Sequence, residues 1–240
     1  MKFFNIIKGK KEYWLVDQIE RDDIPGKQYQ EQLKRVIDEW SKEEIQFISV
    51  LMDERYENWL IDNGFRKISS IVEYTRTLED LREVAVEKYD CYSLDEGFMT
   101  DKEFGELYEY CRSGSANKNE KQSADQIMYS LENELGKEWR KNCYYFLMNK
   151  EVIGISIPHI EIGTLDEGRL FYFGVIPEMR GYGMGTKIHE ISLSILKRIL
   201  EATYYVGSTD IHNEHMIRIF ENNGSVCRSR KGIFNKRRDD

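Results

Sequence analysis

The sequence predicts a mixed α/β protein whose central mixed sheet is flanked by helices. From residue 143 onward, short apolar runs separated by tight turns are typical of antiparallel strands. A strand–helix–strand–helix run follows over residues 170–222. Residues 13–75 repeat that order of apolar runs and amphipathic helices on a smaller scale. We therefore expect a larger α/β segment preceded by a smaller one.

The composition is that of a soluble globular protein. The chain has 240 residues, of which 40% are hydrophobic and 32% charged, which is enough for one large domain or two small ones. Its 35 basic and 43 acidic residues give a net charge of −8. This charge argues against a nucleic-acid or anionic-membrane partner and suits a cationic amine. The composition does not distinguish a monomer from a homodimer.

Targeting and metal-binding signals are missing from the sequence. No apolar run approaches the roughly 20 residues of a membrane span, and the N-terminus lacks the apolar core of a secretory signal. The four cysteines are scattered without metal-ligand or redox-pair spacing. His212 and His215 resemble a metal pair, but they fit a solvated loop better because further ligand types are absent. We expect a cytoplasmic protein without a metal.

The first 80 residues show helix and strand patterns in alternation. Apolar residues at helical spacing predict a helix over residues 27–44, and an apolar run predicts a strand over 47–52. A short helix over 54–62 ends at Asn63-Gly64, a usual C-terminal stop, and a strand over 68–75 follows.

Residues 81–142 are charged and helical in character. Helical spacing of apolar residues predicts helices within 93–111 and 124–140. The most polar stretch, 112–123, predicts a mobile loop, and 81–88 fits either a strand or a linker end.

The remaining elements are clearer. Strands are predicted over 144–148, 152–157, 170–175 and 205–210, and a helix over 187–200. The basic tail from residue 228 predicts a solvated end. An alternative is that Arg228, Arg230 or Lys231 reaches a cofactor phosphate.

A glycine-rich turn over residues 175–186 joins an apolar strand to a helix. A helix start presents unpaired N–H groups and the positive end of the helix dipole, so it attracts anions. Gly181, Gly183 and Gly185 let the backbone approach an oxygen-rich group, and Arg180 adds a cation able to contact phosphate through two bonds. The turn predicts a pyrophosphate cradle. The alternative is that the glycines merely close a strand-to-helix turn.

This stretch resembles motif A of the GNAT acyltransferase superfamily, in which Arg/Gln-x-x-Gly-x-Gly/Ala follows Val-x-Pro at the end of the fourth strand. Arg180, Gly183 and Gly185 fill the fixed positions, and Val175 and Pro177 fill the lead-in. Residues 213–224 are similar to the second GNAT signature, Asn-x-x-Ala-x-x-Leu-Tyr-Glu-x-x-Gly-Phe. The two motifs stand in the family's order and separation. The resemblance spans residues 84–226 and implies a GNAT-like acyl-CoA N-acyltransferase fold.

The resemblance implies acetyl-CoA as acyl donor and a primary amine of a small molecule or peptide as acceptor, joined by direct attack. It implies that Phe173, Gly174 and Val175 hold the pantetheine arm as an added strand would. The Val175 N–H would polarise the thioester carbonyl, and the fourth and fifth strands would part after Val175. The cofactor-binding residues that we expect are Phe173, Gly174, Val175, Arg180, Gly181, Tyr182, Gly183, Met184, Gly185, Thr186 and Asn213.

The catalytic groups depart from the GNAT pattern. Phe220 stands where a tyrosine often protonates the departing thiolate, and Arg169 falls where a carboxylate is usual. Ser208, Asp210 and Tyr172 remain as catalytic candidates, with a water chain as an alternative. These departures leave open a CoA-binding sensor or scaffold that has lost turnover.

The two halves of the chain align without a gap at an offset of 160 residues, which carries Asn63-Gly64 onto Asn223-Gly224. We interpret this as an internal repeat. Residues 1–80 would be a degenerate half-GNAT segment and 81–240 the acetyltransferase domain. The alternative is that any two strand–helix–strand–helix segments align. Residues 20–26, opposite the cradle, carry acidic residues and Pro25 in place of glycines. We therefore expect no cofactor site in the first half.

Overall fold

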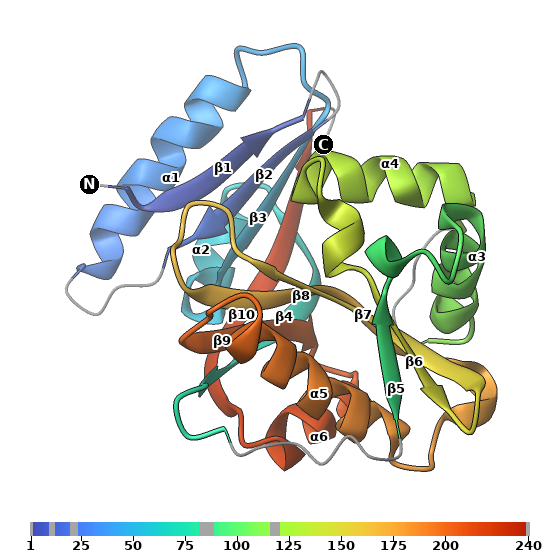
Figure 1. The fold of residues 1–240 in the computed structure, drawn as a ribbon. Helices are drawn as coiled ribbons and strands as arrows, with labels where there is room; N and C mark the ends of the chain where they lie inside the picture. Colours follow the sequence, from blue (N-terminus) through green and yellow to red (C-terminus); the bar gives the residue numbers. More distant parts are fainter. Residues whose placement is uncertain (1, 10–12, 20–23, 82–88, 116–120, 239–240) are drawn as a thin grey trace. The chain divides into compact units, whose positions relative to one another are not determined.

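The computed structural model describes residues 2–9, 13–19, 24–81, 89–115 and 121–238 (Figure 1). The chain divides into two compact units, one formed by residues 1–72 and 229–240 and the other by residues 73–228. Strands β4 (Arg66–Thr77) and β10 (Val226–Arg237) each continue from one unit into the other. The division therefore lies inside these two strands and not at residue 80. The mixed α/β class agrees with the prediction from the sequence.

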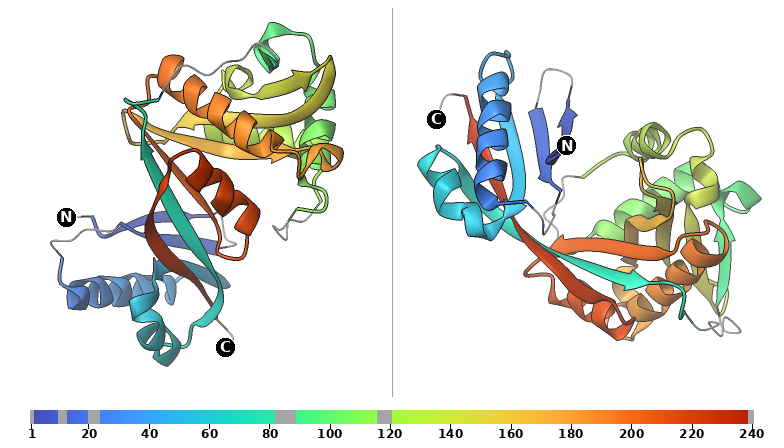
Figure 2. Two further views of the ribbon diagram at one scale, coloured as in Figure 1. Left: turned by 90° about the horizontal axis from the view of Figure 1, so that it is seen from below. Right: turned by 90° about the vertical axis from the view of Figure 1, so that its left-hand side faces the viewer.

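The first unit is a small sheet packed against helices (Figure 2). Its strands pair in the order β1, β2, β3, β10, with β2 and β3 parallel and the other pairs antiparallel. Its other elements are β1 (Phe4–Lys8), β2 (Tyr13–Gln18), α1 (Gly26–Trp40), β3 (Phe47–Asp53), the 3-10 turn η1 (Glu54–Tyr56) and α2 (Glu57–Asp62).

Alternation along the strands explains the core of this unit. Trp14 and Val16 point to the same face of β2, and both are buried against Leu33 of α1 and Leu60 of α2. Phe234 of β10 is buried in the same cluster. The core of the first unit therefore includes a residue from the far end of the chain.

The basic C-terminal stretch is strand β10, so the predicted solvated tail is wrong. Seven residues of β10 pair with β3, from Lys231 opposite Asp53 to Arg237 opposite Phe47. Within the first unit, Lys231 Nζ lies 2.8 Å from Asp17 Oδ1 and Arg230 pairs with Glu54. The partners of β10 lie far away in the sequence, so the basic composition of this stretch gave no sign that it forms a strand.

The second unit is a sheet with helices on both faces. Strands β5 to β8 pair antiparallel in sequence order, and β9 runs parallel to β8. Helices α3 and α4 pack in one apolar cluster with the sheet, and α5 packs in another. The strands are β5 (Asp90–Ser93), β6 (Tyr144–Met148), β7 (Glu151–Ile160), β8 (Glu167–Val175) and β9 (Tyr204–Asp210). The helices are α3 (Asp101–Arg112), α4 (Ala124–Leu135), α5 (Met184–Arg198) and α6 (Glu214–Asn222), with 3-10 turns η2 (Leu94–Glu96), η3 (Trp139–Asn142) and η4 (Pro177–Met179).

Capping boxes set the starts of the two helices that follow β5. The Thr100 side chain accepts from the Glu103 N–H and Ser123 accepts from the Gln126 N–H, each with the reciprocal bond. Residues 116–120 of the predicted mobile loop and residues 82–88 of the predicted strand or linker end lie outside the described residues. None of the helices that the structure describes has both the length and the apolarity to cross a bilayer.

The two units contain matching helix ends at the 160-residue offset. The Phe65 N–H bonds to the Leu60 oxygen after α2, and the Ser225 N–H bonds to the Phe220 oxygen after α6. Gly64 and Gly224 have φ of 82° and 74°, as expected for glycines that end helices. Strands β4 and β10 also begin and end 160 residues apart. These matches support the interpretation of an internal repeat.

Candidate functional site

A cavity of about 520 Å³ lies in the second unit, lined by β8, the glycine-rich turn, α5, β9 and α6. It contains every predicted cofactor-binding residue except Tyr182 and Met184. The Tyr182 side chain is 75% exposed. Residues of the glycine-rich turn and of the second motif, 213–224, therefore line the same cavity.

The glycine-rich turn ends in an open helix start. Helix α5 begins at Met184, three residues before the predicted start, and Gly183 precedes it at φ 81°. Within the described part of the chain, the amides of residues 181–186 make no hydrogen bond, and the first to do so is Lys187, 3.3 Å from the Gly183 oxygen. Nothing lies within 4 Å of a Cβ built on Gly183. Its left-handed backbone is therefore the reason for glycine.

Arg180 bonds the glycine-rich turn to the end of β8 and to α3. Its Nε donates to the Val175 oxygen at 3.1 Å, and its Nη2 donates to the Cys111 oxygen of α3 at 2.9 Å. This use differs from the two-bond phosphate contact that the sequence predicts. Among the described residues, Nη1 has no hydrogen-bond partner.

Strands β8 and β9 separate early. Their pairing covers only Glu167 opposite Tyr204 and Gly168 opposite Tyr205. The predicted separation after Val175 is therefore wrong: the strands part after Gly168, and the rest of β8 has one unpaired edge that lines the cavity.

The register of β8 on β7 shows which main-chain groups face that edge. The Ile176 N–H bonds to the Ile153 oxygen at 3.1 Å, and hydrogen-bonded pairs alternate along antiparallel strands. Gly174, opposite Ile155, therefore directs its N–H and C=O to β7, whereas Phe173 and Val175 direct theirs to the open edge. Gly174 therefore directs no main-chain group to the open edge, although it lines the cavity, and its place among the cofactor-binding residues stays a prediction.

Asn213 is the N-cap of α6. Its Oδ1 accepts from the Met216 N–H at 3.2 Å, and its Nδ2 donates to Thr209 Oγ1 at 3.0 Å. The residue lines the cavity, as expected. Its side chain is largely engaged in starting the helix.

The catalytic candidates have different surroundings. Ser208 lines the cavity with an exposed side chain, and Asp210 does not line it. Tyr172 lines it and packs 4.4 Å from the Tyr108 ring, and burial raises the Tyr172 pKa above its ordinary value. Phe220 is buried and stacks on Tyr74 of β4. No carboxylate is found among the described residues that line the cavity.

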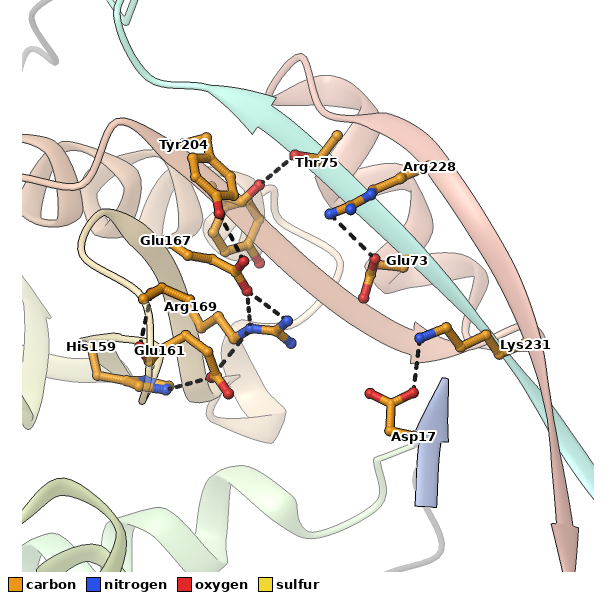
Figure 3. A network of polar contacts seen from close by, with 12 residues as sticks. Asp17, Glu73, Thr75, His159, Glu161, Glu167, Arg169, Tyr204, Arg228 and Lys231 are labelled. Carbon is orange, nitrogen blue, oxygen red and sulfur yellow. Dashed lines mark hydrogen bonds and ion pairs between the residues drawn. The ribbon is translucent and has the colours of Figure 1, made fainter. Parts of the chain in front are cut away.

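A carboxylate does lie at the start of β8, and the sequence analysis missed it. The Glu167 Oε1 accepts from Arg169 Nε at 2.7 Å, and its Oε2 accepts from the Tyr204 hydroxyl at 2.9 Å (Figure 3). Arg169 also lies 3.2 Å from Glu161 Oε2. Both carboxylate oxygens of Glu167 thus hold partners, and the group does not line the cavity. These ion pairs and hydrogen bonds therefore hold the start of β8 to the start of β9 and do not place a carboxylate in the cavity.

A second network that the sequence analysis missed lies beneath the cavity. His189 of α5 is fully buried and contacts Asn223 and the Tyr205 hydroxyl. Burial lowers the His189 pKa to about 3, so the imidazole is neutral at pH 7. A histidine on the apolar face of the 187–200 helix was the one sequence signal for it.

The solved structures that resemble this chain include GNAT acetyltransferases. A GCN5-related N-acetyltransferase from Sphaerobacter thermophilus matches with a TM-score of 0.67 at 13% identity, over 98% of this chain and 76% of that chain. A tandem GNAT protein from the clavulanic acid biosynthesis pathway matches at 0.61 and 13%, over 94% and 75%. A GNAT-family acetyltransferase from Colwellia psychrerythraea matches at 0.58 and 12%, over 93% and 77%. No protein-family model matches the chain. No curated protein matches it either. The likeness shows that the chain has the GNAT fold.

Proposed function

We propose that this chain is an acetyl-CoA-dependent N-acetyltransferase that moves the acetyl group to a primary amine of a small molecule or peptide. The observation that carries the proposal is the row of unbonded amides over residues 181–186, which opens on the same cavity as the free edge of β8. A helix start of this kind binds pyrophosphate, and a free strand edge binds the amide groups of pantetheine.

The positions of the glycine-rich turn and of the β8–β9 junction give the orientation in which the cofactor would bind. The cradle follows the carboxyl end of β8, and the strands meet near its amino end at Gly168. Val175 lies seven positions beyond Gly168 along β8, or roughly 23 Å at 3.3 Å per residue. The arm would start at the Val175 N–H and the outward groups of Phe173, because the Val175 oxygen already accepts from Arg180, and would carry the thioester toward the junction of β8 and β9. We therefore assign the Val175 N–H to the arm and no longer to the thioester carbonyl.

The cavity chemistry supports direct attack of the amine on the thioester. A covalent acyl-enzyme would need a nucleophile, and Cys111 is the cysteine that lines the cavity. Burial raises the pKa of its thiol to about 12, so it stays protonated at pH 7 and is a poor nucleophile. The protein then contributes positioning and electrostatic stabilisation.

Thiol release from acetyl-CoA against a panel of small and peptide amines tests the proposal. We expect amine-dependent release of free coenzyme A, with no acetylated protein detected by mass spectrometry in the absence of amine. Absence of turnover across the panel would contradict the enzyme assignment.

A CoA-binding sensor or scaffold is the second candidate, favoured by the lack of a carboxylate among the described cavity residues. Thermal unfolding with coenzyme A separates both candidates from a protein that binds no CoA. A ligand at 100 times its Kd stabilises the folded state by about 2.7 kcal/mol. Stabilisation without turnover would favour the sensor. The cytoplasmic location, the lack of nucleic-acid and membrane partners, and the choice between monomer and homodimer stay predictions from composition.

A further inference from the structure

Tyr182 lies at the rim of the cavity, in the middle of the glycine-rich turn. Its neighbours Gly181 and Gly183 both line the cavity, whereas Tyr182 does not and is 75% exposed. A single exposed ring on a protein surface needs no explanation by itself. This ring, however, stands among the unbonded amides of the turn, so its surroundings decide what it can bind.

The described chain leaves this ring without a packing partner. A Cβ built on Gly181 or Gly183 meets nothing within 4 Å, so the space on either side of Tyr182 along the turn is open. Among the described residues, Tyr182 has no side-chain hydrogen bond and no ring contact. Phe98, which is 72% exposed, instead packs against the Tyr92 ring with 5.3 Å between the ring centroids. The Tyr182 ring is therefore open to a ligand.

The proposed cofactor brings a flat ring of its own to this rim. In the proposed orientation the pyrophosphate binds the amides of residues 181–186, and the pantetheine arm follows the free edge of β8 into the cavity. The adenosine is joined to the other phosphate, so it extends from the turn in the opposite direction, out of the cavity. The exposed aromatic residue of the turn at this point is Tyr182.

We propose that the Tyr182 ring stacks on the adenine of coenzyme A and thereby forms the adenosine subsite. This inference rests on the proposed function, and it adds a partner for the side chain to the place of Tyr182 in the turn. Every nucleobase has a flat face that stacks on an aromatic ring without hydrogen bonds to the base edges. Because the pyrophosphate is already bound beside the ring, the adenine has a high effective concentration there.

The charge of the turn favours an uncharged base over a cation as the partner of this ring. An ammonium group also binds the face of a tyrosine. Arg180 lies two residues before Tyr182 and the positive end of the α5 dipole follows it, and both repel a cation. The amine acceptor is therefore a poor competitor for the ring, whereas a neutral adenine is not repelled.

Titration of Tyr182→Ala with coenzyme A and with 4′-phosphopantetheine, which lacks the adenosine, tests the inference without requiring turnover. Tyr182 is not among the described residues with positive φ, so alanine keeps the backbone of the turn. We expect Tyr182→Ala to bind coenzyme A roughly 5- to 150-fold more weakly than the wild type, the range for one base stacked on an aromatic side chain. Its affinity for 4′-phosphopantetheine should equal that of the wild type.

Two further variants separate stacking from other effects of the substitution. Tyr182→Phe keeps the stacking face and should bind coenzyme A as the wild type does. Tyr129→Ala is the matched control, since it removes a tyrosine of α4 that is 70% exposed and does not line the cavity, and it should leave coenzyme A affinity unchanged. With a competent amine, Tyr182→Ala should raise KM for acetyl-CoA at the same kcat, because the adenine lies far from the thioester.

An unchanged coenzyme A affinity in Tyr182→Ala, or an equal loss in Tyr182→Phe, overturns the inference and leaves the proposed function standing. An equal loss of affinity for 4′-phosphopantetheine also overturns it, since the ring would then support the turn and not the adenine. A wild type that binds neither compound overturns both the inference and the proposed function.

Discussion

At the scale of single residues, Gly183 shows how backbone conformation and function depend on each other. Its φ of 81° is a conformation that side chains rarely adopt, and its position before α5 places it among the unbonded amides. Open space around a Cβ means that substitution there changes backbone strain and charge without a steric clash. These two effects are separable by experiment.

Gly183→Asp and Gly183→Asn form a pair for that purpose. Both residues tolerate the left-handed region better than most, and they have the same shape. We expect Asp to weaken coenzyme A binding at least about tenfold beyond Asn, because a carboxylate at this position repels the pyrophosphate. Isothermal titration measures the difference. Equal affinities would mean that the phosphates bind elsewhere.

We also predict that Asp23→Gly leaves affinity unchanged, although residue 23 lies outside the described residues.

His189 predicts an acid-sensitive stability. Its pKa is lowered from 6.5 to about 3 in the folded state, so the unfolded state binds the proton more readily between these values. The contribution of His189 to the free energy of unfolding should therefore be fully present above pH 6.5. Below pH 6.5 the free energy of unfolding should decline by about 1.4 kcal/mol per pH unit. His189→Gln removes this contribution while keeping an amide donor. Urea unfolding from pH 7.5 to 4.5 should show a steeper decline for the wild type, and parallel curves would contradict the prediction.

At the scale of elements, each helix that ends in Asn-Gly receives a cation from a long strand. Lys236 Nζ of β10 donates to the Asn63 oxygen at 2.8 Å, and Arg76 of β4 donates to the Asn223 oxygen. The two contacts are related by the 160-residue offset. They differ in consequence, because the Asn223 side chain also holds Thr186 and His189, whereas the Asn63 side chain bonds only to Trp59 among the described residues.

Arg76→Met and Lys236→Met compare these two contacts. Each removes a charged hydrogen bond to a helix C-terminus, so each should lower the free energy of unfolding by about 1–3 kcal/mol. Only Arg76→Met should also weaken coenzyme A binding, since it loosens the residue that steadies the first turn of α5. Chemical unfolding and titration measure the two effects. Equal losses of affinity from the two variants would contradict this division of roles.

At the scale of the whole molecule, the first unit is completed by the end of the chain. Its sheet includes β10, and its core includes Phe234. A fragment of residues 1–80 has neither, and β3 is left with one unpaired edge along seven residues.

We therefore predict that the 1–80 fragment alone is largely unfolded or aggregated. The same fragment joined through a flexible linker to residues 226–238 should fold cooperatively. Circular dichroism and thermal unfolding distinguish the two. A cooperatively folded 1–80 fragment would show that β10 is dispensable for this unit.

The sequence by itself determined the fold class, the glycine-rich turn and the order of elements, because these depend on local spacing. Periodicity places strands and helices, and glycine marks the positions where the backbone must take a left-handed turn or meet an anion. The 160-residue offset was also visible, since the repeated Asn-Gly stops are local signals.

The tertiary structure alone decided which groups of these elements face one another. Three outcomes depended on partners distant in the chain: the parting of β8 and β9 after Gly168, the pairing of the basic tail with β3, and the buried contacts of His189 with Asn223 and Tyr205. Local patterns carry no information about such partners, because a strand edge, a cation or a buried hydroxyl acquires its role from what packs against it.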